Sequence, residues 1–154
     1  MIAVIQRVND ASVEVDGIGV TGEIERGLCV LACVVDGDHA SDIEWMAGKL
    51  ARLRVFPNDQ GRFDLSVQDV GGEILLVSQF TLAGDCRKGN RPSFIRAADP
   101  EHAEPMLERL AELLRDQFGL TVATGRFGGS MKVRLENDGP VTLVVHSPRH
   151  DADE

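Results

Sequence analysis

The sequence lacks any apolar run near the roughly 18 residues that a membrane-spanning helix requires. Its opening, residues 1–7, is too short and too strand-like for a secretion signal. It contains only three cysteines, which cannot all pair within the chain, and none lies in a Cys-x-x-Cys motif. These absences predict a cytoplasmic protein with no membrane contact.

Positive charge is scarce, because 16 Lys and Arg stand against 25 Asp and Glu, for a net charge of −9. A protein that coats many phosphates usually carries the opposite sign, which disfavours extensive nucleic-acid binding but permits contact with one end. The segment 85–96 reverses this trend: Arg87, Lys88, Arg91 and Arg96 stand there against a single acid. It is the one basic segment of the chain.

The common catalytic and metal-binding motifs are also missing. There is no Walker loop, His-Glu-x-x-His, Gly-x-Ser-x-Gly or dinucleotide-binding glycine pattern. The four histidines are scattered, so we expect no metal site and no cofactor. Cys86 opens the basic segment without a nearby His to activate it. Cys29 and Cys33 lie in an apolar run, where we expect buried, inert thiols.

The length of 154 residues fits one domain with one hydrophobic core. An apolar fraction of 43% excludes intrinsic disorder of the whole chain. We expect the domain to cover residues 1–148 and the acidic residues 149–154 to form a flexible tail.

Hydrophobic periodicity predicts two helices. Ser41 is the expected N-cap of the first, and Asp99 caps the second with Pro100 at its first position and Gly119 at its end. The strands are expected mostly in antiparallel hairpins, so the fold class is α+β rather than doubly wound. The expected strands are 1–9, 11–16, 20–24, 28–35, 73–82, 120–123, 131–136 and 141–146, with a further hairpin turn at 57–61.

Two short segments carry unusual polar residues. Ser78-Gln-Phe-Thr-Leu82 places two hydroxyls and an amide at the end of an apolar strand. Burying such a group unpaired costs about 1–3 kcal/mol, so these groups either bond to neighbouring backbone or face a cleft. Asn137-Asp-Gly-Pro-Val-Thr142 has the composition of a hairpin turn, but Pro140 cannot donate a ladder hydrogen bond. The sequence leaves open whether the bond before Pro140 is cis or trans.

Together the two segments resemble the signature motifs of the D-aminoacyl-tRNA deacylases. The similarity runs from Met1 to about Ser147 and includes the opening Met-x-Ala-Val-Ile-Gln-Arg-Val, Ala11-Ser-Val, Lys88-Gly-Asn-Arg-Pro-Ser-Phe94 and Phe127-Gly-x-x-Met131. The resemblance implies a homodimeric α+β fold with a mixed, barrel-like sheet and two main helices. It also implies cofactor-free hydrolysis of the ester between a D-amino acid, or glycine, and the 3′-terminal adenosine of tRNA.

The resemblance further implies that the active site lies at the subunit interface. Ser78, Gln79, Phe80 and Thr81 would form the catalytic segment, with backbone N–H groups stabilising the oxyanion. Thr81 would position the substrate, and the ribose 2′-hydroxyl and a water would carry out the proton transfers.

The same resemblance assigns a chiral filter to Gly139 and Pro140, whose carbonyls would face the partner's pocket across a cis bond. Arg7 would orient this segment, which also contains Asn137. A rigid wall at that place would exclude an L side chain.

The terminal adenine would pack against Phe127 and Met131, and the expected tRNA contacts are Arg87, Lys88 and Arg91. Two alternatives remain open from the sequence. One is a non-catalytic module that binds the tRNA 3′ end. The other is an amide hydrolase that uses Cys86 or Thr81.

Overall fold

The computed structural model describes residues 1–148, so the acidic tail predicted at 149–154 lies outside the described residues. The helices are α1 (Ala40–Arg52) and α2 (Pro100–Asp116), with a short 3-10 helix, η1 (Phe80–Ala83). The strands are β1 (Ile2–Val15), β2 (Gly19–Ile24), β3 (Gly27–Cys33), β4 (Phe56–Pro57), β5 (Phe63–Leu65), β6 (Glu73–Ser78), β7 (Val122–Thr124) and β8 (Met131–His146).

The main sheet is mixed, and the predicted α+β class is confirmed. Its strands follow the order β2-β1-β3-β6-β7, and β8 pairs along β1. The pairs of β1 with β2, β3 and β8 are antiparallel, whereas β3–β6 and β6–β7 are parallel. The sheet curls until β2 approaches β7, where the Thr21 hydroxyl donates to the Thr124 carbonyl oxygen at 3.2 Å. The result is the nearly closed, barrel-like sheet that the resemblance implies.

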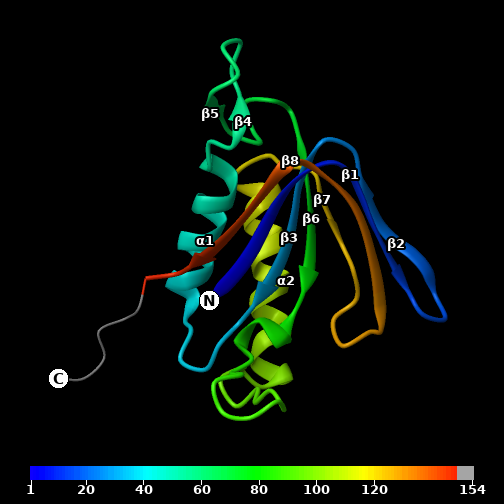
Figure 1. Cartoon of the computed structure of the whole chain (residues 1–154), viewed down its shortest axis with the longest axis vertical. Helices are drawn as coiled ribbons and strands as arrows, with labels where there is room; N and C mark the ends of the chain where they lie inside the picture. Colours follow the sequence, from blue (N-terminus) through cyan, green and yellow to red (C-terminus); the bar gives the residue numbers. More distant parts are fainter. Residues whose placement is uncertain (149–154) are drawn as a thin grey trace.

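Both helices cover one face of the sheet (Figure 1). Their apolar stripes meet β1, β3 and β6 in a core that includes Ile5, Leu28, Leu50 and Leu110. The curled half of the sheet encloses a second cluster around Val13, Cys29 and Leu75. As predicted, Cys29 and Cys33 are buried and Cys86 is exposed. In the described part of the chain neither helix is long and apolar enough to cross a bilayer.

The prediction for the start of α1 is wrong by two residues. The N-cap is His39 rather than Ser41, because the Asp42 carboxylate accepts a hydrogen bond from the His39 N–H at 2.8 Å. The start of α2 is confirmed: Asp99 precedes Pro100, which needs no N–H at the first position of a helix. The turn at 57–61 is also confirmed, since it joins β4 to β5.

Two strand predictions are wrong, and both concern the unusual polar segments. The strand expected at 73–82 ends at Ser78, after which the chain turns into η1. The hairpin expected at 137–142 is absent, because β8 runs unbroken from Met131 to His146. Its partner β1 is long enough to pair with both halves, so the extra residues bulge out of one strand instead of turning back.

Candidate active site

The segment 78–81 lies where β6 leaves the sheet. The Gln79 N–H donates to the Ala32 carbonyl oxygen at 2.8 Å, which anchors the segment to β3. Beyond this anchor the 3-10 turn brings Phe80 and Thr81 to the surface, and Phe80 is 59% exposed. These two residues open η1, where backbone N–H groups have no preceding turn to bond to. Both N–H groups can therefore donate to a bound molecule.

The polar side chains of this segment bond to each other. The Gln79 amide nitrogen donates to the Thr81 hydroxyl oxygen, which fixes Thr81 while leaving its proton free to donate. None of the three His side chains within residues 1–148 lines the adjoining cavity. The segment therefore offers donors rather than a general base.

A narrow apolar cavity of about 310 Å³ lies beside the segment. Ser78, Gln79 and Phe80 line one side of it, and Phe94 and Phe127 contribute aromatic rings. The rings of Phe80 and Phe94 meet edge to face, with centroids 5.2 Å apart. The structure thus brings three of the four predicted catalytic residues and Phe127 together around one cavity, whereas Thr81 does not line it.

Phe94 lines the cavity, although its sequence position predicts no role for it beyond the similarity to the family. The available signal is an aromatic residue inside the polar segment 85–96. Cys33 also lines the cavity, and burial raises the pKa of its thiol, so a neutral thiol is present at this place. Burial raises the pKa of Cys29 to about 11. Neither thiol is activated for attack.

Met131 does not line this cavity or the larger one beside it. Its sulfur accepts a hydrogen bond from the Arg126 N–H at 3.5 Å, beneath the loop that carries Phe127. Met131 therefore supports that loop from below.

The basic segment forms a loop at the edge of the cavity. Two backbone hydrogen bonds between Asp85 and Ser93, of 2.8 and 3.0 Å, close its ends. Arg87 bonds to both carboxylate oxygens of Asp85 and holds the pKa of that carboxyl well below its usual range. Lys88 and Arg91 are exposed. One predicted tRNA contact, Arg87, is therefore already paired, whereas Lys88 and Arg91 face solvent.

The segment around Gly139 forms a large bulge in β8. Gln6 pairs with Thr142 and Val8 with Asn137, so residues 138–141 all lie opposite Arg7. The Gly139–Pro140 bond is cis, both residues are exposed, and Gly139 has a φ of 134° that favours glycine. The bulge presents this dipeptide to the outside of the sheet.

Arg7 holds the bulge from beneath. Its side chain is 9% exposed. Its Nε donates to the Asp138 carbonyl oxygen at 3.0 Å, and one terminal nitrogen donates to the Val55 carbonyl oxygen at 2.7 Å. Its guanidinium carbon also lies 5.4 Å from the ring centroid of Phe63. Arg7 therefore ties β8 to the segment that leads into β4 and β5.

Asn137 closes the bulge from within. Its side-chain oxygen accepts from the Val141 N–H at 2.8 Å, and its amide donates to the Thr142 hydroxyl at 2.9 Å. The side chain thus replaces the ladder bonds that the bulge removes from the backbone.

The two signature segments lie apart within one chain. In the sheet register Ser78 of β6 pairs with Ala32 of β3. Arg7 of β1 pairs with Leu28 of β3, which in turn pairs with Ile74 of β6. Parallel to the strands, the bulge therefore lies four residues from Ser78, which is about 13 Å. Across the sheet it lies three strands away, which is roughly 14 Å. Figure 1 shows the same separation, with the β4–β5 hairpin and the loop after η1 at opposite ends of the molecule. One copy does not bring Gly139 and Pro140 to the cavity.

Residues 1–148 contain no group of three or more His, Cys, Asp or Glu side chains that could hold a metal ion. The donors that surround the cavity are backbone N–H groups, hydroxyls and amides. They are suited to binding a developing negative charge and to orienting an ester.

Comparison with known proteins agrees with this geometry. A sequence model of the family described as D-Tyr-tRNA(Tyr) deacylase matches residues 4–146. The D-aminoacyl-tRNA deacylase of Halalkalibacterium halodurans is 53% identical over 147 residues, which cover 96% of this chain and 99% of that protein. The enzyme of the same name from Natranaerobius thermophilus is 50% identical over 147 residues, covering 96% and 97%.

Two solved structures are similar over nearly the whole chain. A c-Myc DNA Unwinding Element Binding Protein superposes with a TM-score of 0.90 at 42% identity, covering 97% of this chain and all of that one. A probable eukaryotic D-amino acid tRNA deacylase has a TM-score of 0.81 at 18% identity, covering 94% and 97%. The second match concerns the fold alone. The sequence identity, the family match and the shared fold together place this chain in the D-Tyr-tRNA(Tyr) deacylase family.

Proposed function

We propose that this protein hydrolyses the ester bond between a D-amino acid and the 3′-terminal adenosine of tRNA, and that it also accepts glycine. The observation that carries the proposal is the aromatic cavity beside the unpaired N–H groups of Phe80 and Thr81. A cavity of this kind fits a nucleoside carrying an ester, and family membership supports the same reaction.

In the proposed mechanism the protein stabilises charge and positions the reactants. The N–H groups of Phe80 and Thr81 donate to the oxyanion that forms when water attacks the ester, and each such donor is typically worth about 10²–10³ in rate. The ribose 2′-hydroxyl of the substrate relays the proton to the leaving 3′-oxygen. Gln79 orients Thr81, whose proton donates to the substrate.

The nucleoside is held by stacking and by charge. Phe127 and Phe94 offer faces to the adenine, and a stacked base contributes about 1–3 kcal/mol. Lys88 and Arg91 are exposed on the loop that brings Phe94 to the cavity, and cations there pair with phosphates and position a nucleic acid without reading its sequence.

We further propose that Gly139 and Pro140 of a second copy complete the site as a chiral filter. Exchanging L for D swaps hydrogen and side chain at one carbon, so a backbone wall at the L position admits only hydrogen there. A steric wall discriminates more strongly than a missing contact does. Glycine has hydrogen at both positions and passes.

A homodimer follows from the same proposal, and a row of apolar side chains supports it. Val144 pairs with Val4, and Val4 pairs with Leu31, so the three side chains share one face of the sheet. Val144 is 62% exposed and the other two are partly buried. A second copy that packs symmetrically against this row would bury its exposed apolar side chains close to the bulge.

The test is the rate of deacylation of tRNA charged with D-tyrosine, L-tyrosine or glycine. Release is expected from the D-tyrosyl and glycyl esters and not from the L-tyrosyl ester. Binding of all three without release would overturn the hydrolase and favour the module that only binds the tRNA end. Loss of activity after thiol alkylation, together with an inactive Cys86→Ser variant, would favour the cysteine hydrolase instead.

A further inference from the structure

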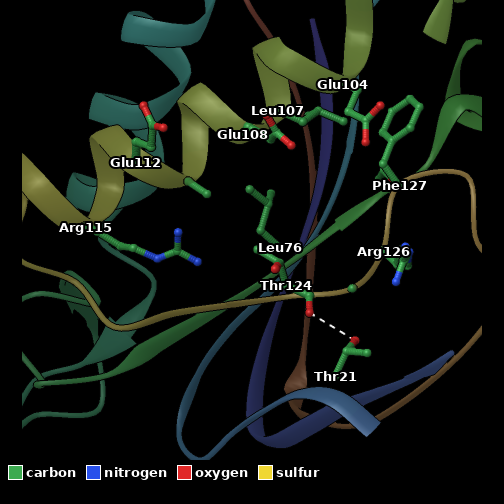
Figure 2. Close-up of a pocket in the computed structure, with 13 residues that line it drawn as sticks. Thr21, Leu76, Glu104, Leu107, Glu108, Glu112, Arg115, Thr124, Arg126 and Phe127 are labelled. Atoms are coloured by element: carbon green, nitrogen blue, oxygen red, sulfur yellow. Dashed lines mark hydrogen bonds between the residues drawn. The ribbon is translucent and has the colours of Figure 1, made fainter. Parts of the chain in front are cut away.

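A second cavity, of about 530 Å³, continues from the apolar one. The two share Ser78, Leu107 and Phe127, so they adjoin each other at these three residues. The second is an open groove between α2 and the loop that joins β7 to β8 (Figure 2). If the apolar cavity holds the terminal adenosine, this groove is the adjoining space for the nucleotide before it.

The walls of the groove carry opposite charges. Glu104 and Glu108 lie four residues apart on α2, on the same helix face. Arg126 lies on the facing loop, beside Phe127 (Figure 2). Within residues 1–148 none of these three side chains forms an ion pair. Their charges are therefore available to a ligand.

The far end of the groove differs. Glu112 is paired with Arg109 at 3.1 Å, and Arg115 donates to the Val122 carbonyl oxygen at 2.9 Å. The Glu112 and Arg115 side chains are therefore already bonded within the protein. The unpaired charges gather at the end nearest to Phe127, where the groove meets the apolar cavity.

The loop that carries Arg126 is held in place. The Gly129 N–H donates to the Arg126 carbonyl oxygen at 3.0 Å, and the Arg126 N–H donates to the Met131 sulfur. The backbone at Arg126 is thus fixed before any ligand binds, which lowers the entropic cost of using its side chain.

We propose that this groove binds the penultimate cytidine of the cytidine-cytidine-adenosine end that every tRNA carries. Arg126 pairs with the phosphate that joins this cytidine to the terminal adenosine. Glu104 and Glu108 accept hydrogen bonds from the exocyclic amine of the cytosine, which is the contact that carboxylates make with this base. A uracil in its place presents a carbonyl oxygen to the carboxylates and is rejected.

This proposal rests on the proposed function and explains how an acidic groove can accept RNA. The phosphate lies on the arginine side, and the carboxylates face a base edge that donates. Acidic residues at this place thus select a base instead of repelling the strand.

The test measures affinities of three non-hydrolysable probes for the full-length protein. They are 3′-(D-tyrosylamino)-3′-deoxyadenosine alone, the same group ending a CCA trinucleotide, and the same group ending a CUA trinucleotide, in which only the penultimate base differs. The CCA probe is expected to bind roughly tenfold more tightly than either of the others.

Two variants locate the effect. In Arg126→Ala the advantage of the CCA probe over the nucleoside is expected to fall close to one. In the double variant Glu104→Gln and Glu108→Gln the preference for CCA over CUA is expected to shrink, because a carboxamide also donates to the uracil carbonyl. Lys49→Ala, which removes a cation from α1, is the matched control and retains both ratios.

Each failure has a separate meaning. Equal binding of the CCA probe and the nucleoside would overturn the groove proposal and leave the proposed function standing. Failure of the nucleoside probe itself to bind would overturn the proposed function, and the groove proposal with it.

Discussion

Arg7 is the residue whose contacts constrain the 137–142 segment most directly. It bonds in two directions, to the Asp138 and Val55 carbonyl oxygens, from a buried position. Only a planar guanidinium can hold two acceptors that lie apart in this way. The proposed filter therefore depends on an arginine and not merely on a positive charge.

Arg7→Lys is expected to lower both stability and chiral selectivity. Lysine leaves one buried carbonyl without a donor, which costs about 2 kcal/mol. Urea unfolding measures that loss, and the ratio of D-tyrosyl to L-tyrosyl release is expected to fall. Arg54→Lys is the control, because Arg54 lies in an exposed ion pair with Asp64 and such pairs contribute little. Unchanged selectivity in Arg7→Lys would remove Arg7 from the filter.

Thr81→Val is expected to slow deacylation about tenfold without abolishing it, because a single hydrogen bond to the substrate is lost. The backbone N–H groups that stabilise the oxyanion remain in the variant. Single-turnover release of D-tyrosine measures the chemical step. A fall to the uncatalysed rate would show that Thr81 is the nucleophile.

Among the elements, β3 and β6 approach each other unusually closely at Gly27. A Cβ built there would lie 1.8 Å from the Glu73 carbonyl oxygen, which is backbone and cannot move aside. Gly48 differs, since the nearest atom to its Cβ is the end of the flexible Arg52 side chain at 3.1 Å.

Gly27→Ala is therefore expected to destabilise the protein by about 3 kcal/mol, the upper part of the range for overpacking. Gly48→Ala, inside α1, is the matched control and is expected to stabilise by about 0.5–1 kcal/mol. Urea unfolding of both variants gives the two values. Equal stability of Gly27→Ala and the parent would contradict the close parallel pairing of β3 and β6.

Local signals account for the elements that the sequence predicted well. Asp99 and Pro100 mark the start of α2, and an apolar stripe covers its buried face. The prediction of a hairpin at 137–142 was wrong because the residues on both sides of this segment pair with β1, more than 120 residues away in the sequence. Turn composition cannot reveal whether a distant strand will pair across the turn.

The candidate site shows the same division. The segment 78–81 stands out in the sequence by its polar residues at a strand end. Phe94 and Arg126 reach the two cavities through loops whose paths depend on tertiary packing. The use of Arg7 beneath the bulge became an expectation only through the resemblance, because periodicity alone places it on an ordinary strand.

The proposed active site requires two copies of the chain. Val144→Asp places a charge on the apolar row that pairs Val144 with Val4. We expect the molar mass in solution to fall from two chains to one, with loss of deacylation. Light scattering after gel filtration measures the mass, and Val20→Asp, at an exposed position of β2, is the control. A Val144→Asp dimer with full activity would contradict the proposed interface.

In the proposed dimer each active site combines Ser78 to Thr81 of one copy with Gly139 and Pro140 of the other. Two variants each disable one half. Ser78→Trp fills the cavities that Ser78 lines. Gly139→Val places a Cβ 2.8 Å from the Val141 side chain at a φ of 134° and displaces the bulge.

The most direct measurement is D-tyrosyl-tRNA deacylation by the heterodimer of these two variants, purified through a different tag on each chain. Each parent homodimer is expected to be inactive, because both of its sites carry a lesion. The heterodimer combines both lesions in one site and leaves the other intact, so about half of the unmodified activity is expected. A heterodimer as inactive as its parents would contradict the composite site.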